Sequence, residues 1–135
     1  MTIMETIKIN TKKQFEIINI TKKVNEYLEN PELCDGLINI YTKHTTSAII
    51  INENETGLIK DFKNTLNNLI PENKDYHHNS IDNNARSHLQ SLFLSSSQTI
   101  PFKDNKLLLG TWQSIFFIEL DGPRTNREII LTIIN

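Results

Sequence analysis

Three of the four histidines stand in polar segments beside hydroxyl or amide residues. His44 begins the run His44-Thr45-Thr46, which separates two apolar, strand-like runs at 36–41 and 48–51. His78 and His88 lie in a second polar stretch, which is rich in Asn, Ser and Asp. Neutral imidazole is the commonest zinc ligand, and three such rings with one open position would form a catalytic type of metal site. A metal-free cluster that binds anions and moves protons, or three separate structural histidines, are the alternatives.

Two carboxylates could assist either chemistry. Glu53 ends the second apolar run, and Asp61 follows it in a segment with helical periodicity. A carboxylate that accepts a hydrogen bond from a ligating imidazole fixes its tautomer, and one beside a metal-bound water could take its proton. Glu53 could instead form a structural salt bridge, and Asp61 could be a solvated carboxylate stabilised by the helix dipole.

Hydroxyl and cationic residues suited to phosphate oxygens accompany the histidines. Thr45, Thr46 and Ser47 supply hydroxyls and backbone N–H groups on a short turn, and Arg124 could add a bidentate clamp. Stabilisation of the turn is the alternative for the hydroxyls. For Arg124 the alternative is a surface ion pair with Asp121.

Three further side chains are candidates for the same site. Asn84 precedes His88 by four residues, so both would lie on one face of a helix. Gln113 is followed by apolar strand residues and would need polar partners if it were buried, which favours a polar pocket. Trp112 is either a ligand platform or, more commonly for tryptophan, part of the core.

Length and composition predict one ordinary globular domain over residues 1–135. The chain has 135 residues, of which 38% are hydrophobic and 22% charged, with a net charge of −2. Lys and Arg are scattered, so a nucleic-acid partner is not expected. No segment approaches the roughly 20 apolar residues that span a bilayer, so no membrane partner is expected either. The single cysteine excludes an intrachain disulfide and favours a cytoplasmic protein.

The apolar periodicity predicts an α+β fold with a mainly antiparallel sheet and two to three helices. The strongest helix is expected over 56–70, where Leu58, Phe62, Leu66 and Leu69 form one stripe and Pro71 ends it. Weaker helices are expected over 21–28 and 83–94. Strands are expected within 1–10 and over 15–18, 37–41, 47–53, 98–102, 106–109, 111–120 and 128–134, with the first two forming a hairpin.

The order of these motifs resembles the YjbQ family, which is often named secondary thiamine-phosphate synthase. The matching positions are His44-Thr45-Thr46, Asn52-Glu53, Asp61, Tyr76 with His78, Asn84 with His88, Pro101, Gly110 to Gln113, and Asp121 to Arg124. Two positions where the family commonly has glycine carry Asn105 and Ser95 here. The match covers essentially the whole chain.

The resemblance implies a YjbQ-like fold, a homotrimer and a cleft built around the histidines. It also implies formation of thiamine phosphate from phosphorylated substrates, with His44, His78 and His88 as ligands of a divalent metal, zinc before others. Glu53, Asp61 and Gln113 would then be catalytic, and Thr45, Thr46, Asn84, Trp112 and Arg124 would bind the substrate. A non-catalytic trimeric module that binds a metal or phosphate, and a metal-dependent hydrolase, are the alternative functions.

Overall fold

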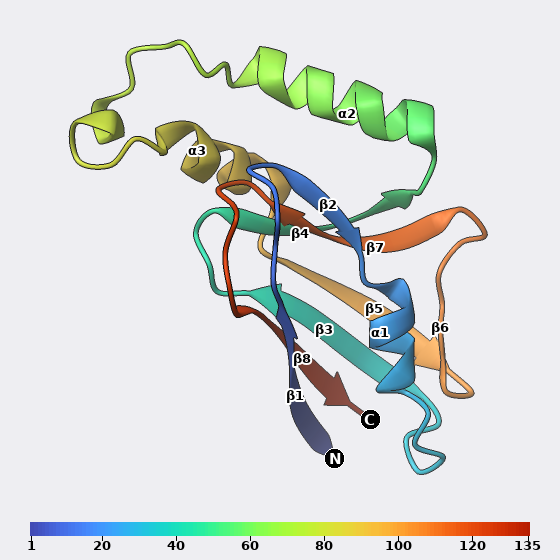
Figure 1. Ribbon diagram of the computed structural model, residues 1–135. Helices are drawn as coiled ribbons and strands as arrows, with labels where there is room; N and C mark the ends of the chain where they lie inside the picture. The colour runs from blue at the N-terminus through green and yellow to red at the C-terminus, as the bar shows by residue number, and fades with distance from the viewer.

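Two antiparallel sheets and an outer layer of helices make up the fold (Figure 1). The computed structural model describes all 135 residues. The strands are β1 (Thr2–Ile9), β2 (Glu16–Asn19), β3 (Gly36–Thr42), β4 (Ser47–Glu53), β5 (Ser97–Lys103), β6 (Lys106–Leu107), β7 (Gln113–Glu119) and β8 (Arg127–Ile134). The helices are α1 (Thr21–Glu26), α2 (Thr56–Leu69) and α3 (Ala85–Leu94), with a 3-10 turn, η1 (His77–Ser80). The predicted α+β class is confirmed.

The larger sheet has the strand order β1–β8–β3–β5–β6, and the smaller has the order β2–β7–β4. Their facing sides enclose the main core, which α1 completes through Val24 and the following Leu28. Alternation explains this arrangement, because Ile129, Leu131 and Ile133 of β8 all face inward and are fully or almost fully buried. A second, smaller apolar cluster on the outer side of the small sheet includes Leu66 of α2 and Phe116 of β7.

The predicted hairpin at the N-terminus is wrong, because β1 and β2 belong to different sheets. β1 pairs with β8 in the large sheet, and β2 pairs with β7 in the small one. The connecting segment 10–15 carries the chain from one sheet to the other, which apolar alternation alone does not reveal. Pairing of β1 with β8 also places the two termini side by side, and the Met1 ammonium donates to the Asn135 carbonyl at 2.9 Å.

Local sequence explains where several elements begin and end. The Glu55 carboxylate caps α2 by accepting a hydrogen bond from the Leu58 amide at 3.0 Å. Asp104 and Asn105 have positive φ values of 50° and 62°, which confirms the predicted turn between β5 and β6. Ser95, at the end of α3, has a φ of 88°. Both positions that differ from the family's usual glycine are therefore in backbone conformations that glycine favours.

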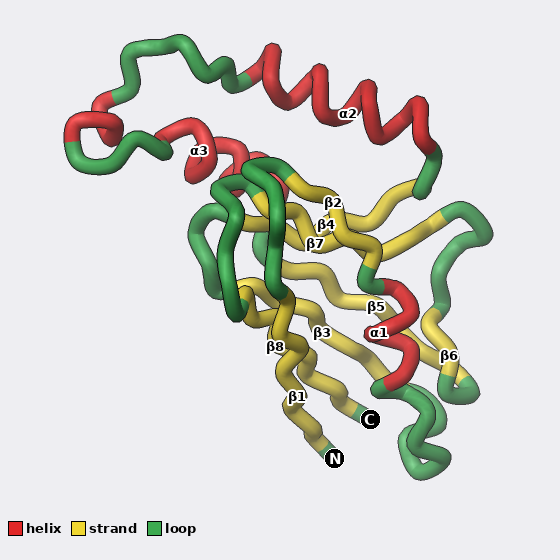
Figure 2. The backbone as a smooth tube through the Cα atoms, viewed as in Figure 1, coloured by secondary structure: helices red, strands yellow, loops and turns green.

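The connecting segments 43–46 and 120–126 lie side by side at the end of the sheets near α3 (Figure 2). The Leu120 amide donates to the Thr46 carbonyl at 3.1 Å, which joins the two segments. Two serine hydroxyls hold α3 against them: Ser91 donates to the Ser47 carbonyl and Ser87 to the Leu120 carbonyl, both at 2.6 Å. None of the helices combines the length and the apolar character needed to cross a bilayer.

Candidate functional site

A polar pocket opens where the segments 43–46 and 120–126 meet α3. Its volume is about 420 Å³, and no apolar side chain lines it. The lining residues are Lys43, His44, Thr45, Thr46, Asp82, Asn84, His88, Arg124 and Arg127. An adjoining open hollow of about 610 Å³ shares His44 and His88 with it. Six of the predicted site residues therefore lie in one place.

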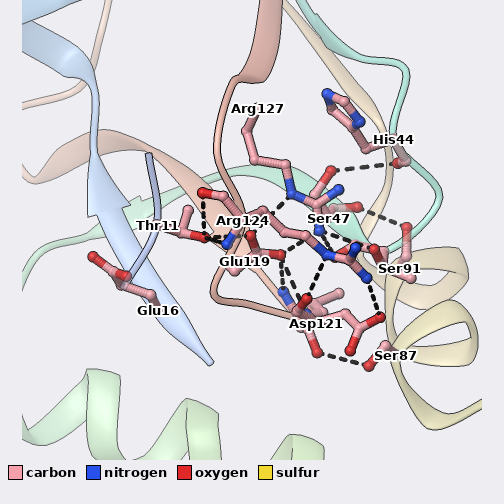
Figure 3. A network of polar contacts seen from close by, with 12 residues as sticks. Thr11, Glu16, His44, Ser47, Ser87, Ser91, Glu119, Asp121, Arg124 and Arg127 are labelled. Atoms are coloured by element: carbon pink, nitrogen blue, oxygen red, sulfur yellow. Dashed lines mark hydrogen bonds and ion pairs between the residues drawn. The ribbon is translucent and has the colours of Figure 1, made fainter. Parts of the chain in front are cut away.

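A buried ion pair forms the base of this pocket (Figure 3). The Arg127 guanidinium pairs with the fully buried carboxylate of Glu119, and its Nη2 also donates to the Thr46 hydroxyl at 2.9 Å. The Thr11 hydroxyl donates at 2.6 Å to Oε1 of Glu119, which also accepts from Nε of Arg127 at 2.9 Å. Burial raises the pKa of Glu119, but the hydrogen bonds from Arg127 and Thr11 outweigh it and leave that pKa below its ordinary value. Arg127 Nη2 also donates to the Thr46 carbonyl at 3.4 Å, so a buried cation holds both the side chain and the backbone of Thr46.

A second series of hydrogen bonds runs along the rim of the pocket. The Asn84 amide donates to the Asp121 carboxylate at 2.9 Å, and Arg124 Nη2 donates to the same oxygen at 2.9 Å. Because the amide nitrogen of Asn84 is used in this way, its oxygen accepts from Nε2 of His78 at 3.0 Å. Burial raises the pKa of Asp121, but these two donors outweigh it and lower that pKa overall. The His88 ring packs edge-on against His78, with 4.7 Å between centroids.

His44 is held as a neutral ring. Its Nε2 accepts a hydrogen bond from the Glu128 backbone amide at 2.9 Å, so the proton of the neutral ring is on Nδ1. Burial lowers the pKa of His44, and the nearby charge of Arg127 lowers it further. Protonation would also break the bond to the Glu128 amide. His44 is therefore a neutral lining residue of the pocket with its N–H on Nδ1, rather than a positive charge.

The three histidines do not fit a three-ligand metal site as they are arranged. No group of three or more His, Cys, Asp or Glu side chains is placed to hold a metal ion. Nε2 of His44 and Nε2 of His78 are both engaged in hydrogen bonds within the chain. A divalent metal stays a prediction, and no chemical step is assigned to one.

Four predicted site residues lie away from the polar pocket. Glu53 ends β4 and pairs with Gln113 of β7, whereas His44 precedes the opposite end of β4. The seven residues of β4 place these two ends about 20 Å apart, at about 3.3 Å per residue. Asp61 is exposed on α2, and Trp112 is 72% exposed beside β7. None of the four lines the polar pocket or the hollow that adjoins it.

Sequence reasoning missed Lys43, Asp82, Glu119 and Arg127 at the site. One signal was present, because Glu119 interrupts an apolar run between Ile118 and Leu120. A carboxylate in such a run needs a buried partner, and the arginine that opens the last apolar strand is the natural candidate. Lys43 forms an exposed pair with Glu128 at 2.9 Å and gives no comparable signal.

We expect the protein to lose stability in two stages as the pH falls. The fold lowers the pKa of His44 from 6.5, so the unfolded chain binds that proton more readily and stability decreases below about pH 6.5. The lowered pKa of Glu119 stabilises the fold above the unfolded value, and this contribution is lost as the pH falls through the folded value. Urea unfolding between pH 8 and pH 3 measures both stages. His44→Gln should remove only the first, and a wild-type protein that gains stability on acidification would contradict the assignment.

The sequence of this chain matches a family of known proteins. The model of the family described as UPF0047 protein YjbQ-like matches residues 5–135. A UPF0047 protein of Methanothermobacter thermautotrophicus is 46% identical over 91% of this chain and 86% of its own length. The UPF0047 protein YugU of Bacillus subtilis is 35% identical over 91% and 93%.

Solved structures agree with the sequence comparison. A crystal structure from Sulfolobus solfataricus, described as a YbjQ-like protein of unknown function, has a TM-score of 0.94 and 37% identity, and the match covers 98% of this chain and 96% of that one. A hypothetical protein of Aeropyrum pernix has a TM-score of 0.91 and 33% identity over 98% of each chain. The agreement of sequence and fold over nearly the whole length shows that the chain belongs to the YjbQ/UPF0047 family.

Proposed function

We propose that the polar pocket binds the phosphate groups of a small phosphorylated molecule. The observation that carries this proposal is the convergence of Arg124, His44 and the exposed Thr45 in a pocket without apolar side chains. Arg124 is half exposed and uses its Nε and one Nη2 bond on Asp121, so further guanidinium N–H groups remain for a ligand. Hydrogen bonds from such a cation to phosphate oxygens are strong and directional.

The reaction proposed at this site is thiamine-phosphate formation, so that the protein would be a secondary thiamine-phosphate synthase. Pyrophosphate leaves a pyrimidine methylene carbon, and a thiazole phosphate takes its place. The leaving group gains negative charge in the transition state, and donors fixed in advance lower that barrier without covalent catalysis. Arg124 and the Nδ1–H of His44 supply such donors, and Asn84 holds Asp121 so that Arg124 stays in position.

The proposed enzyme is a cytoplasmic homotrimer. The trimer is supported by the separation of the predicted site residues, because none of Glu53, Asp61, Gln113 and Trp112 lines the polar pocket of its own chain. A head-to-tail contact would bring this end of one subunit to the pocket of the next, and three such contacts close a ring. The catalytic roles predicted for Glu53, Asp61 and Gln113, and substrate contact by Trp112, belong to this arrangement.

Replacing Arg124 by glutamine tests the binding proposal. We expect the affinity for pyrophosphate, measured by isothermal titration calorimetry, to fall by about tenfold or more, because a charge-assisted hydrogen bond is lost. Lys103→Gln is the matched control, since it removes an exposed cation on β5 away from the pocket. Equal affinities for all three proteins would contradict the proposal.

The same variants separate the three functions. A synthase restores growth of a thiamine-auxotrophic strain, and Arg124→Gln does so poorly. Tight binding of pyrophosphate without rescue of growth or turnover would favour a binding module. Phosphatase activity that a chelator abolishes would favour a metal-dependent hydrolase, and elemental analysis of the purified protein tests the predicted zinc directly.

A further inference from the structure

Arg127 has one guanidinium nitrogen that the protein itself does not use. Its Nε donates to Oε1 of Glu119, and its Nη2 donates to Oε2 of Glu119 and to the hydroxyl and carbonyl of Thr46 (Figure 3). Nη1 makes no hydrogen bond within the chain. A guanidinium carries N–H donors on all three of its nitrogens, so those on Nη1 remain for another acceptor.

This nitrogen is open to the polar pocket. Arg127 lines the pocket, although its side chain is only 7% exposed. Among side chains that are not exposed, the nitrogen or oxygen atoms that are both sealed from solvent and without a hydrogen-bond partner are Nε of Arg86 and Nε2 of Gln90. Nη1 of Arg127 is not one of them, so solvent reaches it, and the polar pocket provides the opening.

The fold fixes this donor before any ligand arrives. A flexible side chain that is recruited from the surface loses rotamer freedom when it binds, and this loss weakens the binding. Arg127 has already lost that freedom on folding, because its hydrogen bonds to Glu119 and Thr46 fix the plane of the guanidinium. Arg124 is half exposed and is held by Asp121 alone. Arg127 is therefore the better preorganised of the two arginines in the pocket.

The buried position of the ion pair also needs a reason. Replacing a buried ion pair by apolar residues of similar size is often neutral or stabilising, so stability alone does not explain why such a pair is present. Here the pair holds an N–H donor at the base of a pocket that has no apolar lining. Glu119 neutralises the charge of Arg127, so this arginine offers a ligand directional hydrogen bonds more than long-range attraction.

We propose that Arg127 binds the phosphate group of the ligand at the base of the polar pocket through Nη1, while Arg124 binds it from the rim. This inference rests on the proposed function, because it requires a phosphorylated ligand in that pocket. It adds a contact that the motif containing Arg124 does not include. Glu119 is then a positioning residue, which acts on the ligand through Arg127.

A titration of the wild-type protein with pyrophosphate tests the contact directly. NMR signals of the arginine side chains, assigned through their bonds to the backbone in isotope-labelled protein, report the surroundings of each guanidinium. We expect the Arg127 signals to shift and to saturate at the concentration at which calorimetry shows binding to be complete. If pyrophosphate binds and these signals do not move, this inference is wrong and the proposed function stands. If pyrophosphate does not bind, both are wrong.

Arg127→Lys separates the hydrogen-bond donor from the charge. Lysine keeps a cation beside Glu119 but lacks the planar guanidinium, so we expect the affinity for pyrophosphate to fall by about tenfold or more. Arg86→Lys is the matched control, since it makes the same change in a partly buried arginine that pairs with Glu72 and does not line the pocket. Circular dichroism confirms that both variants fold. Equal affinities of the two variants would overturn the proposal.

Discussion

Replacing Arg127 by methionine is expected to lower the free energy of unfolding by about 3–5 kcal/mol. Arg127 is 7% exposed and its partner, Glu119, is fully buried, so solvent does not screen the pair appreciably. Methionine fills much of the space of the arginine stem but leaves the Glu119 carboxylate buried with Thr11 as its remaining side-chain donor. The cost of an uncompensated buried charge dominates the loss.

Two further variants show whether burial causes this loss. Lys43→Gln removes the exposed ion pair to Glu128, and we expect it to cost far less stability than Arg127→Met because solvent screens an exposed pair. The double variant Arg127→Met with Glu119→Gln also removes the unpaired charge of the buried Glu119 carboxylate, so it should recover part of the stability that Arg127→Met loses. Urea unfolding at pH 7 measures all of them. A loss in Arg127→Met no larger than that in Lys43→Gln would show that the buried pair contributes little.

This pair also shows where sequence reasoning stopped. His44, Thr45 and Thr46 were found because a polar run between two apolar strands is visible in the sequence. Arg127 and Glu119 were missed because both belong to strands. A charged side chain on a strand is buried or exposed depending on whether its face of the strand is covered by another part of the protein. That depends on pairing between segments far apart in the chain, which local periodicity does not contain.

The positions of the helices and strands were largely predictable from the sequence, but which strands pair with one another was not. α2 was expected over 56–70 and covers Thr56–Leu69, and β4 was expected over the range it occupies. The N-terminal hairpin was predicted because strands that follow one another in sequence usually pair. Here β1 pairs instead with β8, from the other end of the chain. The pairing of these two terminal strands is decided by tertiary packing and not by the local sequence.

The same limit applies to the site. Asn84 and His88 were expected together from helical spacing, and both line the polar pocket. Glu53 was expected beside the histidines because a carboxylate could assist their chemistry and because the family resemblance includes Asn52-Glu53. A strand of seven residues lies between them, and its extended backbone separates their side chains. Short sequence separation across a strand therefore means large spatial separation, and a shared site requires two chains.

Co-expression of two inactive variants is expected to restore activity if the site is shared between subunits. His44→Ala changes a residue that lines the polar pocket, and Asp61→Asn removes an exposed carboxylate of α2, so each variant alone should lose most of the proposed thiamine-phosphate formation. In a mixed ring, a site is intact when an Asp61→Asn subunit supplies His44 and its neighbour, a His44→Ala subunit, supplies Asp61. Random mixing in equal amounts makes about a quarter of the sites intact in a head-to-tail ring.

The co-expressed mixture distinguishes a site shared between two subunits from a site that is complete within one chain. If each pocket were complete within one chain, every site in every mixed ring would carry a defect and no activity would return. The control co-expresses wild-type protein with a double His44→Ala, Asp61→Asn variant, which leaves about a quarter of sites intact in the shared arrangement and about half in the other. Restored activity would assign Asp61 to the neighbouring subunit's pocket, because each intact site then needs His44 from one subunit and Asp61 from another.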